Sequence, residues 1–405
     1  MDYLSGMFSV FVFGMVVALL GTVKLKLTPK IGADDAQFGK LVAILQFSMV
    51  IFAIVAGVLL DILGFKTIII LGFVITAIAF FLVGSAKTYG LVALAAILLG
   101  IGGQFANNGG NVLIPMLFSD PATGSNFGNT FFGLGAFLLP LVAGRLLERM
   151  ELQKALTIIA VIILIPLIFP LFATLPTKEA SFSGELAMNL LGNWITWLAA
   201  LTLFCYIGLE TSMATWITSY AKDVNATDSQ AANSLSIFFI AMMISRLLLG
   251  ISGLDLAPIG GYVIALVALI SAGVIFWMTT ITELSTARIA LATAGFFFGP
   301  VFPTTIGVTF QHYDSSSWGT LFGVIFAIGL LGATLLPAWI GALAKGKTVK
   351  QSLSILVVTA VFLAILGFGL GMVPRDTTAT PAAVDGAAEV VPAVPGTTDQ
   401  APVQE

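Results

Sequence analysis

The 405-residue sequence has few charged residues, one cysteine and one histidine. Cys205 alone excludes an intrachain disulfide, and His312 alone excludes a histidine-rich metal site. The sequence also lacks a P-loop, a Gly-Xaa-Ser-Xaa-Gly elbow and a credible nucleophile–base pair. We therefore expect neither an enzyme nor an ATP-driven pump, and we expect no cofactor. No basic patch indicates nucleic acid, since the formal charge is only −3.

Apolar residues dominate what remains. The chain is 58% hydrophobic and 9% charged, with a mean hydropathy of +1.06. This balance predicts an all-α integral membrane protein. We expect the first run to be a span and not a cleaved signal peptide, because Met1–Tyr3 carry no basic segment. Twelve runs are long enough to cross a bilayer: 3–23, 40–60, 67–86, 91–118, 126–147, 154–175, 194–219, 231–251, 260–281, 286–310, 317–343 and 351–373.

The runs divide six and six around the longest connection, from Leu175 to Asn193. The segment Gly135–Pro140 resembles Gly332–Pro337 at an offset of 197 residues, which indicates a duplicated six-helix unit, although Gly, Leu and Ala are abundant enough for chance matches. After Pro374 small residues and scattered acids predict a disordered acidic tail. We expect four parts: an N-terminal six-helix bundle (1–175), a central loop (176–193), a C-terminal six-helix bundle (194–374) and the tail (375–405).

A stripe of amides interrupts the fourth run. Gln104, Asn107, Asn108 and Asn111 fall on one face of a helix at about 100° per residue. Each unpaired polar group in an apolar environment costs roughly 1–3 kcal/mol, so such residues tend to face a bundle interior or a water-filled cavity. Amides carry donors and acceptors together, which suits an uncharged ligand rich in hydroxyls. Hydrogen bonding between packed helices is the alternative reading.

Three charged residues in or near the apolar runs are candidates for a functional role. Glu210 is the acid expected deep in the membrane, as a proton or cation coupling site, a hydroxyl acceptor or a structural carboxyl bonded to a neighbouring helix. Arg246 lies near the end of its run, where its side chain is expected to reach the membrane interface. Asp61 also ends a run. We expect Arg246 and Asp61 to have structural or gating roles at helix ends.

Prolines and aromatic residues give further expectations. Pro300 and Pro303 predict a bend or break in the tenth run, of the kind that adjoins binding sites in transporters. Trp197 and Phe302 are candidates for stacking on a solute, with interfacial anchoring or packing as the alternatives. Gln46 lies a third of the way into the second run, and an orientation toward the cavity and one away from it are equally compatible with the sequence. The residues expected to contact a solute are Gln46, Gln104, Asn107, Asn108, Asn111, Trp197, Glu210 and Phe302.

The segment from Gly57 to Lys66, with Asp61 and Gly64, resembles the signature loop of the major facilitator superfamily between helices two and three. Within that superfamily the chain resembles the fucose/glucose–cation symporter branch. The resemblance implies two six-helix bundles around a central cavity, alternating access and a monosaccharide substrate. The segments that carry the branch resemblance are Phe131–Ala136 with Pro140, Tyr206–Glu210 and Gly299–Thr304.

The sequence departs from that branch where proton-coupled fucose transporters carry acids. The first run has no acid from Phe8 to Val23, and Asn107 stands where the helix-four acid would be. Proton coupling, sodium coupling and simple facilitation all stay open. The segment Gly102–Asn108 also resembles the Gly-rich helices of nitrate porters, which hold their anion with cavity arginines. No arginine precedes Arg145 here, so an anion is disfavoured.

The resulting hypothesis is a secondary transporter for a small neutral polar solute, a hexose or deoxyhexose, coupled to H⁺ or Na⁺ or uncoupled. We expect a monomer in the cell inner (plasma) membrane with both termini cytoplasmic, as in the family. That orientation leaves most basic connections outside, contrary to the positive-inside rule. The alternatives are a carrier of another solute, such as a drug-like amphiphile, and a solute receptor of the same fold that transports nothing.

Overall fold

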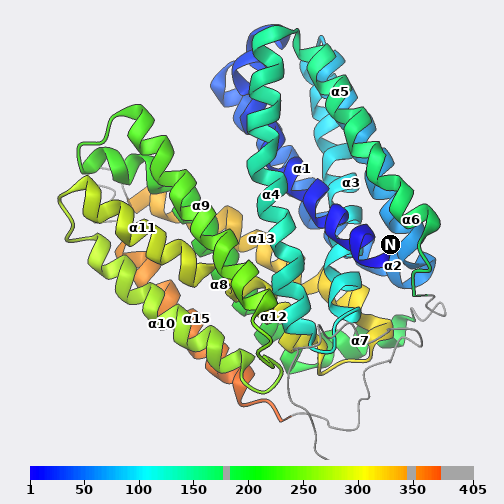
Figure 1. Cartoon of the computed structure of the whole chain (residues 1–405), viewed down its shortest axis with the longest axis vertical. Coiled ribbons are helices and arrows are strands. Elements are labelled where there is room, and N and C mark those ends of the chain that lie inside the picture. Colours follow the sequence, from blue (N-terminus) through cyan, green and yellow to red (C-terminus); the bar gives the residue numbers. More distant parts are fainter. Residues whose placement is uncertain (177–182, 344–352, 375–405) are drawn as a thin grey trace, which may run out of the picture.

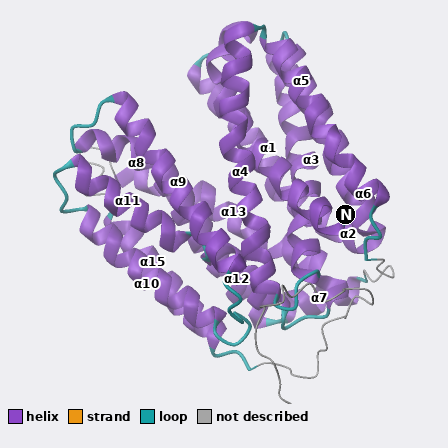
Figure 2. Cartoon of the chain, in the orientation of Figure 1, coloured by secondary structure: helices purple, strands orange, loops and turns teal. Residues whose placement is uncertain are grey.

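The computed structural model describes residues 1–176, 183–343 and 353–374, and every regular element in these ranges is helical (Figure 2). The expected tail, 375–405, lies outside the described residues. Large apolar side chains cover the outer faces of the helices: Phe47, Leu266 and Ile365 are among those left exposed. Such a surface suits a lipid environment and would cause a protein in water to aggregate.

The N-terminal half begins with a helix that ends at Gly32, whose left-handed conformation returns its N–H to the preceding turn. Asp34 then opens the next helix with a capping box completed by Gln37. The elements of this half are α1 (Asp2–Ile31), α2 (Asp35–Ser85), α3 (Tyr89–Met116), α4 (Pro121–Arg149), α5 (Leu152–Leu164), the 3₁₀ turn η1 (Ile165–Leu167) and α6 (Ile168–Phe172).

Helix α2 contains two spans. Its 51 residues would measure about 77 Å if straight, more than twice the thickness of a hydrocarbon core. At Gly64 the backbone leaves helical geometry, with φ of 76°, and the chain turns back. Eleven helical stretches of the described chain qualify as membrane spans by length and composition. Because α2 covers the two expected runs 40–60 and 67–86, each of the twelve predicted runs is mainly helical within the described residues.

The C-terminal half follows the same plan after a short helix, α7, within the connection expected to be a loop. The tenth run is interrupted at Gly299 and Pro300, so the predicted bend is confirmed. The elements are α7 (Gly184–Gly192), α8 (Trp194–Asp223), α9 (Asp228–Ile251), α10 (Gly260–Met278), α11 (Leu284–Phe298), α12 (Val301–Phe310), the 3₁₀ turn η2 (Ser315–Ser317), α13 (Trp318–Leu343) and α15 (Ser354–Gly371).

The repeated glycines make equivalent contacts in the two halves. A Cβ on Gly135 in α4 would collide with the carbonyl oxygen of Phe11 in α1, and a Cβ on Gly332 in α13 would collide with that of Phe204 in α8. Each glycine therefore lets the fifth helix of its half pack directly on the first. The same contact at positions 197 residues apart supports the duplication expected from the sequence.

The two groups of helices diverge toward the top of Figure 1 and meet at the end that carries α7. There Asp61 of α2 accepts hydrogen bonds from the backbone N–H groups of Gly319 (3.1 Å) and Thr320 (2.6 Å), in the first turn of α13. Asp120, before α4, accepts one from the N–H of Leu256 (2.9 Å). Two carboxylates thus join the halves at the end that we call the closed end.

Candidate functional site

The amide stripe forms a hydrogen-bonded ladder along α3. Asn107 Nδ2 donates to Gln104 Oε1 (3.3 Å), and Asn111 Nδ2 donates to Asn107 Oδ1 (2.7 Å). Asn108 Nδ2 donates to the Gln104 carbonyl oxygen (2.9 Å). All four side chains are at most 3% exposed. The expectation that they share one helix face inside the protein is confirmed, while a role in binding solute stays a prediction.

The opposite face of α3 packs on the second half of α2. Gly102 lies against Thr76, and Gly109 lies against Ile69. The ladder therefore points away from this neighbour and toward the middle of the molecule, where α3 also contacts α13 of the other half. The amides consequently lie near the junction of the two halves.

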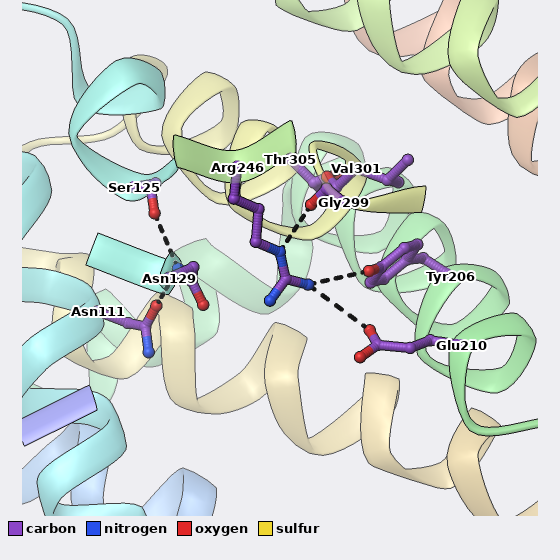
Figure 3. A network of polar contacts seen from close by, with 9 residues as sticks. All are labelled: Asn111, Ser125, Asn129, Tyr206, Glu210, Arg246, Gly299, Val301 and Thr305. Carbon is purple, nitrogen blue, oxygen red and sulfur yellow. Dashed lines mark hydrogen bonds and ion pairs between the residues drawn. The ribbon is translucent and has the colours of Figure 1, made fainter. Parts of the chain in front are cut away.

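A polar stripe on α4, which the sequence analysis missed, extends the ladder. Asn129 Nδ2 donates to Asn111 Oδ1 (2.9 Å) and to the Ser125 carbonyl oxygen (3.0 Å), as Figure 3 shows. One turn nearer the closed end, Asn126 Nδ2 donates to Thr304 Oγ1 (2.9 Å) in the other half. The polar stripe on α4 thus contacts both the α3 ladder, through Asn129, and the other half, through Asn126.

Several atoms of this amide cluster have no hydrogen-bond partner among the described residues. They are Gln104 Nε2, Asn108 Oδ1, Asn126 Oδ1 and Ser125 Oγ. Each buried polar atom without a hydrogen-bond partner destabilises the folded protein by about 1–3 kcal/mol. The cluster therefore keeps both donor and acceptor capacity for a ligand or for water.

The C-terminal half holds charges at its centre. Arg246 of α9 donates from Nε to the carbonyl oxygen of Gly299 (2.8 Å) and from Nη2 to Tyr206 Oη (3.1 Å). Its Nη2 also lies 3.8 Å from Glu210 Oε2, and the two side chains are 4% and 17% exposed (Figure 3). The expectation that Arg246 reaches the membrane interface is wrong. The side chain turns inward because an acid, a phenol and a carbonyl oxygen offer it partners there.

Glu210 is only loosely held by this arginine. A charge-assisted hydrogen bond between a guanidinium and a carboxylate is typically about 2.7–2.9 Å long, whereas the closest approach here is 3.8 Å. The carboxylate also has the more exposed side chain of the pair. Glu210 therefore has an oxygen able to take a proton, a cation or a hydroxyl donor.

Two of the aromatic and amide candidates lie toward the centre. Phe302 of α12 is 7% exposed, and its ring lies 6.4 Å from that of Tyr206 and 5.8 Å from that of Phe326. Gln46 is half-buried on the face of α2 that carries Asp61, since fifteen residues separate them, about four turns. Gln46 thus lies on the face toward α13, well away from the closed end.

Trp197 is not brought to either cluster. It lies nine residues before Tyr206, which places it on the opposite face of α8 and about 14 Å away along the axis. Its Nε1 donates to the carbonyl oxygen of Leu191 at the end of α7 (2.8 Å), and the side chain is 46% exposed. Trp197 therefore joins α7 to α8, which favours the anchoring alternative, while stacking on a solute stays an untested prediction.

These features define a membrane protein of two repeated six-helix halves with polar groups at their junction, the construction of a secondary transporter. The sequence profile of the Major Facilitator Superfamily matches residues 6–337, and the chain belongs to this superfamily. It is an MFS secondary transporter and not an enzyme.

Similar proteins differ in what they are named for. The "Protein TsgA homolog" of Erwinia tasmaniensis is 24% identical over 334 residues, covering 81% of this chain and 84% of that protein. The "Uncharacterized MFS-type transporter YfkL" of Bacillus subtilis is 26% identical over 359 residues, covering 84% and 88%. The "Probable nitrate transporter NarT" of Staphylococcus haemolyticus is 25% identical over 288 residues, covering 62% and 74%.

A solved structure with the same fold is the transporter FucP in its outward conformation. It superposes with a TM-score of 0.76 at 17% identity, covering 91% of this chain and 99% of FucP. FucP is described as the fucose:proton symporter of E. coli. At this identity the likeness establishes the fold and leaves the solute to be argued from the residues.

Proposed function

We propose that this transporter carries a small, neutral, polar solute, a hexose or deoxyhexose, by alternating access. The observation that supports the proposal most strongly is the buried amide cluster on α3 and α4, in which Gln104 Nε2 and Asn108 Oδ1 lack partners among the described residues. A sugar hydroxyl both donates and accepts, so it can satisfy an unpaired amide N–H and an unpaired amide oxygen. Asn107 and Asn111 would exchange their mutual hydrogen bonds for bonds to solute.

Neutrality of the solute follows from the charges nearby. Arg246 and Glu210 offset each other within the C-terminal half, and the amide cluster carries no formal charge. A charged solute would leave an uncompensated charge in a buried site, which costs several kcal/mol. An uncharged solute leaves the balance of charge unchanged, and Phe302 offers it an apolar face.

We propose Glu210 as the coupling site for H⁺ or Na⁺. Its carboxylate is partly accessible and loosely paired, so a cation can bind it without first breaking a short ion pair. Neutralising Glu210 changes what Arg246 contacts, which links ion binding to the conformation of the C-terminal half. A facilitator without coupling would show no such dependence.

We propose that Asp61 acts as a gate and that the closed end faces the cytoplasm. The two carboxylates that hold this end, Asp61 and Asp120, bond to backbone N–H groups of the opposite half. Those hydrogen bonds must break when the halves separate there. With both termini cytoplasmic in the inner membrane, the structure then represents an outward-facing monomer, in keeping with its likeness to outward FucP.

Uptake of a labelled monosaccharide panel into proteoliposomes tests the proposal, with and without pH and sodium gradients. We expect saturable uptake of one or a few hexoses, stimulated by one of the gradients. Binding without flux indicates a receptor of this fold. No binding and no uptake by a preparation with a sharp unfolding transition contradicts the monosaccharide proposal.

A second candidate, a carrier of a small anion, is favoured by one observation. The sequence analysis disfavoured anions because it placed no arginine in the cavity, yet Arg246 is 3% exposed at the centre of its half. Its guanidinium is already engaged by Tyr206 and faces Glu210, so an anion would have to displace the acid. Replacing Glu210 by Gln separates the two: it strengthens the binding of an anion and weakens that of a sugar bonded to the carboxylate.

A further inference from the structure

The bend between α11 and α12 removes a hydrogen bond from a specific carbonyl group. In an α-helix the N–H of residue 303 would donate to the carbonyl oxygen of residue 299, and Pro303 has no N–H. The ladder continues on both sides, since Gly299 N donates to Gly295 O (3.1 Å) and Thr304 N donates to Pro300 O (3.0 Å). The carbonyl of Gly299 is therefore left without its helical donor.

Arg246 supplies a donor to that carbonyl. Its Nε lies 2.8 Å from Gly299 O, and an N–H on a charged group makes a stronger hydrogen bond than an amide. The arginine comes from α9, a different span, which packs directly against this one. A Cβ on Gly299 would lie 2.6 Å from the carbonyl oxygen of Met242, so only glycine lets the two backbones come close enough.

The other side of the same guanidinium faces α8. Nη2 donates to Tyr206 Oη (3.1 Å) and lies 3.8 Å from Glu210 Oε2. In Figure 3 the group is seen with Gly299 on one side and the phenol and carboxylate on the other. One side chain therefore connects an acid on α8, its own helix α9 and the backbone of the bent span.

We propose that Arg246 is a positioning residue: it takes the place of the N–H missing from Pro303 and links the charge on Glu210 to the bend between α11 and α12. When Glu210 is neutralised, the guanidinium loses its ion pair and settles on Gly299 O and Tyr206 Oη. The bend is then held differently in the two charge states. We call the hydrogen bond from Arg246 to Gly299 O, which supports the bend, the brace. The brace stands on the geometry alone, while its link to ion coupling rests on the proposed function.

A double-mutant cycle between Arg246 and Pro303 tests the brace. Pro303→Ala restores an N–H that can bond to Gly299 O within the helix. We expect Arg246→Gln to lower the unfolding temperature in detergent by several degrees, on the order expected for one lost buried interaction. In the Pro303→Ala background the same substitution lowers it by less, because the carbonyl no longer needs Arg246, whereas the lost contacts with Tyr206 and Glu210 are common to both backgrounds. Additive effects of the two substitutions overturn the brace.

Arg288 provides the matched control, since it is an arginine on α11 of the same half. Arg288→Gln should lower stability equally in the native background and in the Pro303→Ala background. If the Arg246→Gln protein does not fold, Arg246→Lys replaces it in the cycle. An ammonium keeps the charge but cannot bond to Gly299 O and Tyr206 Oη in the same fork geometry. If Arg246→Lys lowers the unfolding temperature equally in the native and Pro303→Ala backgrounds, the brace is also overturned.

The link to Glu210 has a separate readout. The Arg246→Gln/Pro303→Ala protein is expected to exchange solute across liposomes without a gradient, and to lose the stimulation of uptake that we expect an imposed ion gradient to give the native protein. Preserved gradient stimulation contradicts the link and leaves the brace to the stability cycle. Absence of exchange by the native protein itself contradicts the proposed function and leaves the brace untouched.

Discussion

The two halves repeat one helical scaffold but have different chemistry at their centres. At the repeat offset of 197 residues, Asn107 and Asn108 of α3 correspond to Thr304 and Thr305 of α12, all of them buried. The N-terminal half has a neutral amide ladder with atoms that lack a partner among the described residues. The C-terminal half has an arginine and an acid that neutralise each other. A duplicated scaffold has thus assigned hydrogen bonding to one half and charge to the other.

This division has an energetic basis. Amides can exchange one hydrogen-bond partner for another at little net change in free energy, about 1 kcal/mol per bond. Removing the partner of a buried charge costs several times as much free energy. The neutral half is therefore suited to binding and releasing a solute, and the charged half is suited to binding and releasing a coupling ion.

The largest effect is expected from breaking the charged pair on one side. Arg246→Leu leaves Glu210 without its countercharge and Gly299 without its donor, so we expect a loss of about 3 kcal/mol in the free energy of unfolding. Adding Glu210→Leu should restore part of it, since the uncompensated charge is gone. Chemical unfolding in detergent measures both. A double variant less stable than Arg246→Leu would show that the charges contribute independently.

Removing an amide that joins two helices should have a smaller effect. Asn129→Leu removes the donor to Asn111 Oδ1 and to the Ser125 carbonyl oxygen, which predicts a loss of about 2 kcal/mol. Thr130→Val, the neighbouring control, removes one longer hydrogen bond to the Asn126 carbonyl oxygen (3.3 Å). Comparable losses in the two variants, measured by the same unfolding assay, would show that the ladder is no special source of stability.

An amide with an unpaired oxygen should matter more for solute than for stability. Asn108→Leu removes a hydrogen bond to the Gln104 carbonyl oxygen (2.9 Å) and a long one to Gln104 Oε1 (3.4 Å), both within the same helix, so we expect a change within about 1 kcal/mol in unfolding free energy. If Asn108 Oδ1 accepts a solute hydroxyl, solute affinity falls about tenfold, equivalent to roughly 1.4 kcal/mol. Equilibrium binding and unfolding on the same preparation separate the two; unchanged affinity removes Asn108 from the site.

The smallest effect belongs to a buried hydroxyl on α4. Ser125 Oγ has no partner within the described part of the chain, so Ser125→Ala should leave stability unchanged or raise it by up to about 0.5 kcal/mol. Thermal unfolding checks this. A clear destabilisation would mean that the hydroxyl binds an ordered water in the folded protein.

Local patterns in the sequence predicted the features that depend on one helix. The twelve runs follow from the length of the apolar segments, the bend follows from Pro300 and Pro303, and the shared face of Gln104 and Asn107 follows from their spacing. The stripe on α4, with Ser125 and Asn129 one turn apart, was visible in the same way and was overlooked. The nine-residue separation of Trp197 from Tyr206 likewise placed the tryptophan on the wrong face for a shared site.

Features that depend on the relation between helices could not be read from the sequence. The inward turn of Arg246 requires knowing that its helix packs beside the carbonyl that Pro303 leaves without a donor. The hydrogen bond from Asn129 to Asn111 depends on the register of α3 against α4. Asp61 illustrates both cases, because its position at a helix end was evident but its partners in α13 lie about 260 residues further along the chain.

Solute exchange by the Asn107→Leu protein tests most directly whether the amide ladder binds a neutral solute. Exchange of labelled monosaccharide across proteoliposomes needs no ion gradient, so it reports on the solute site separately from coupling. We expect the native protein and Glu210→Gln to exchange, and Asn107→Leu to lose affinity by about tenfold to a hundredfold for one or two lost hydrogen bonds. Unchanged exchange by a folded Asn107→Leu protein would contradict the account.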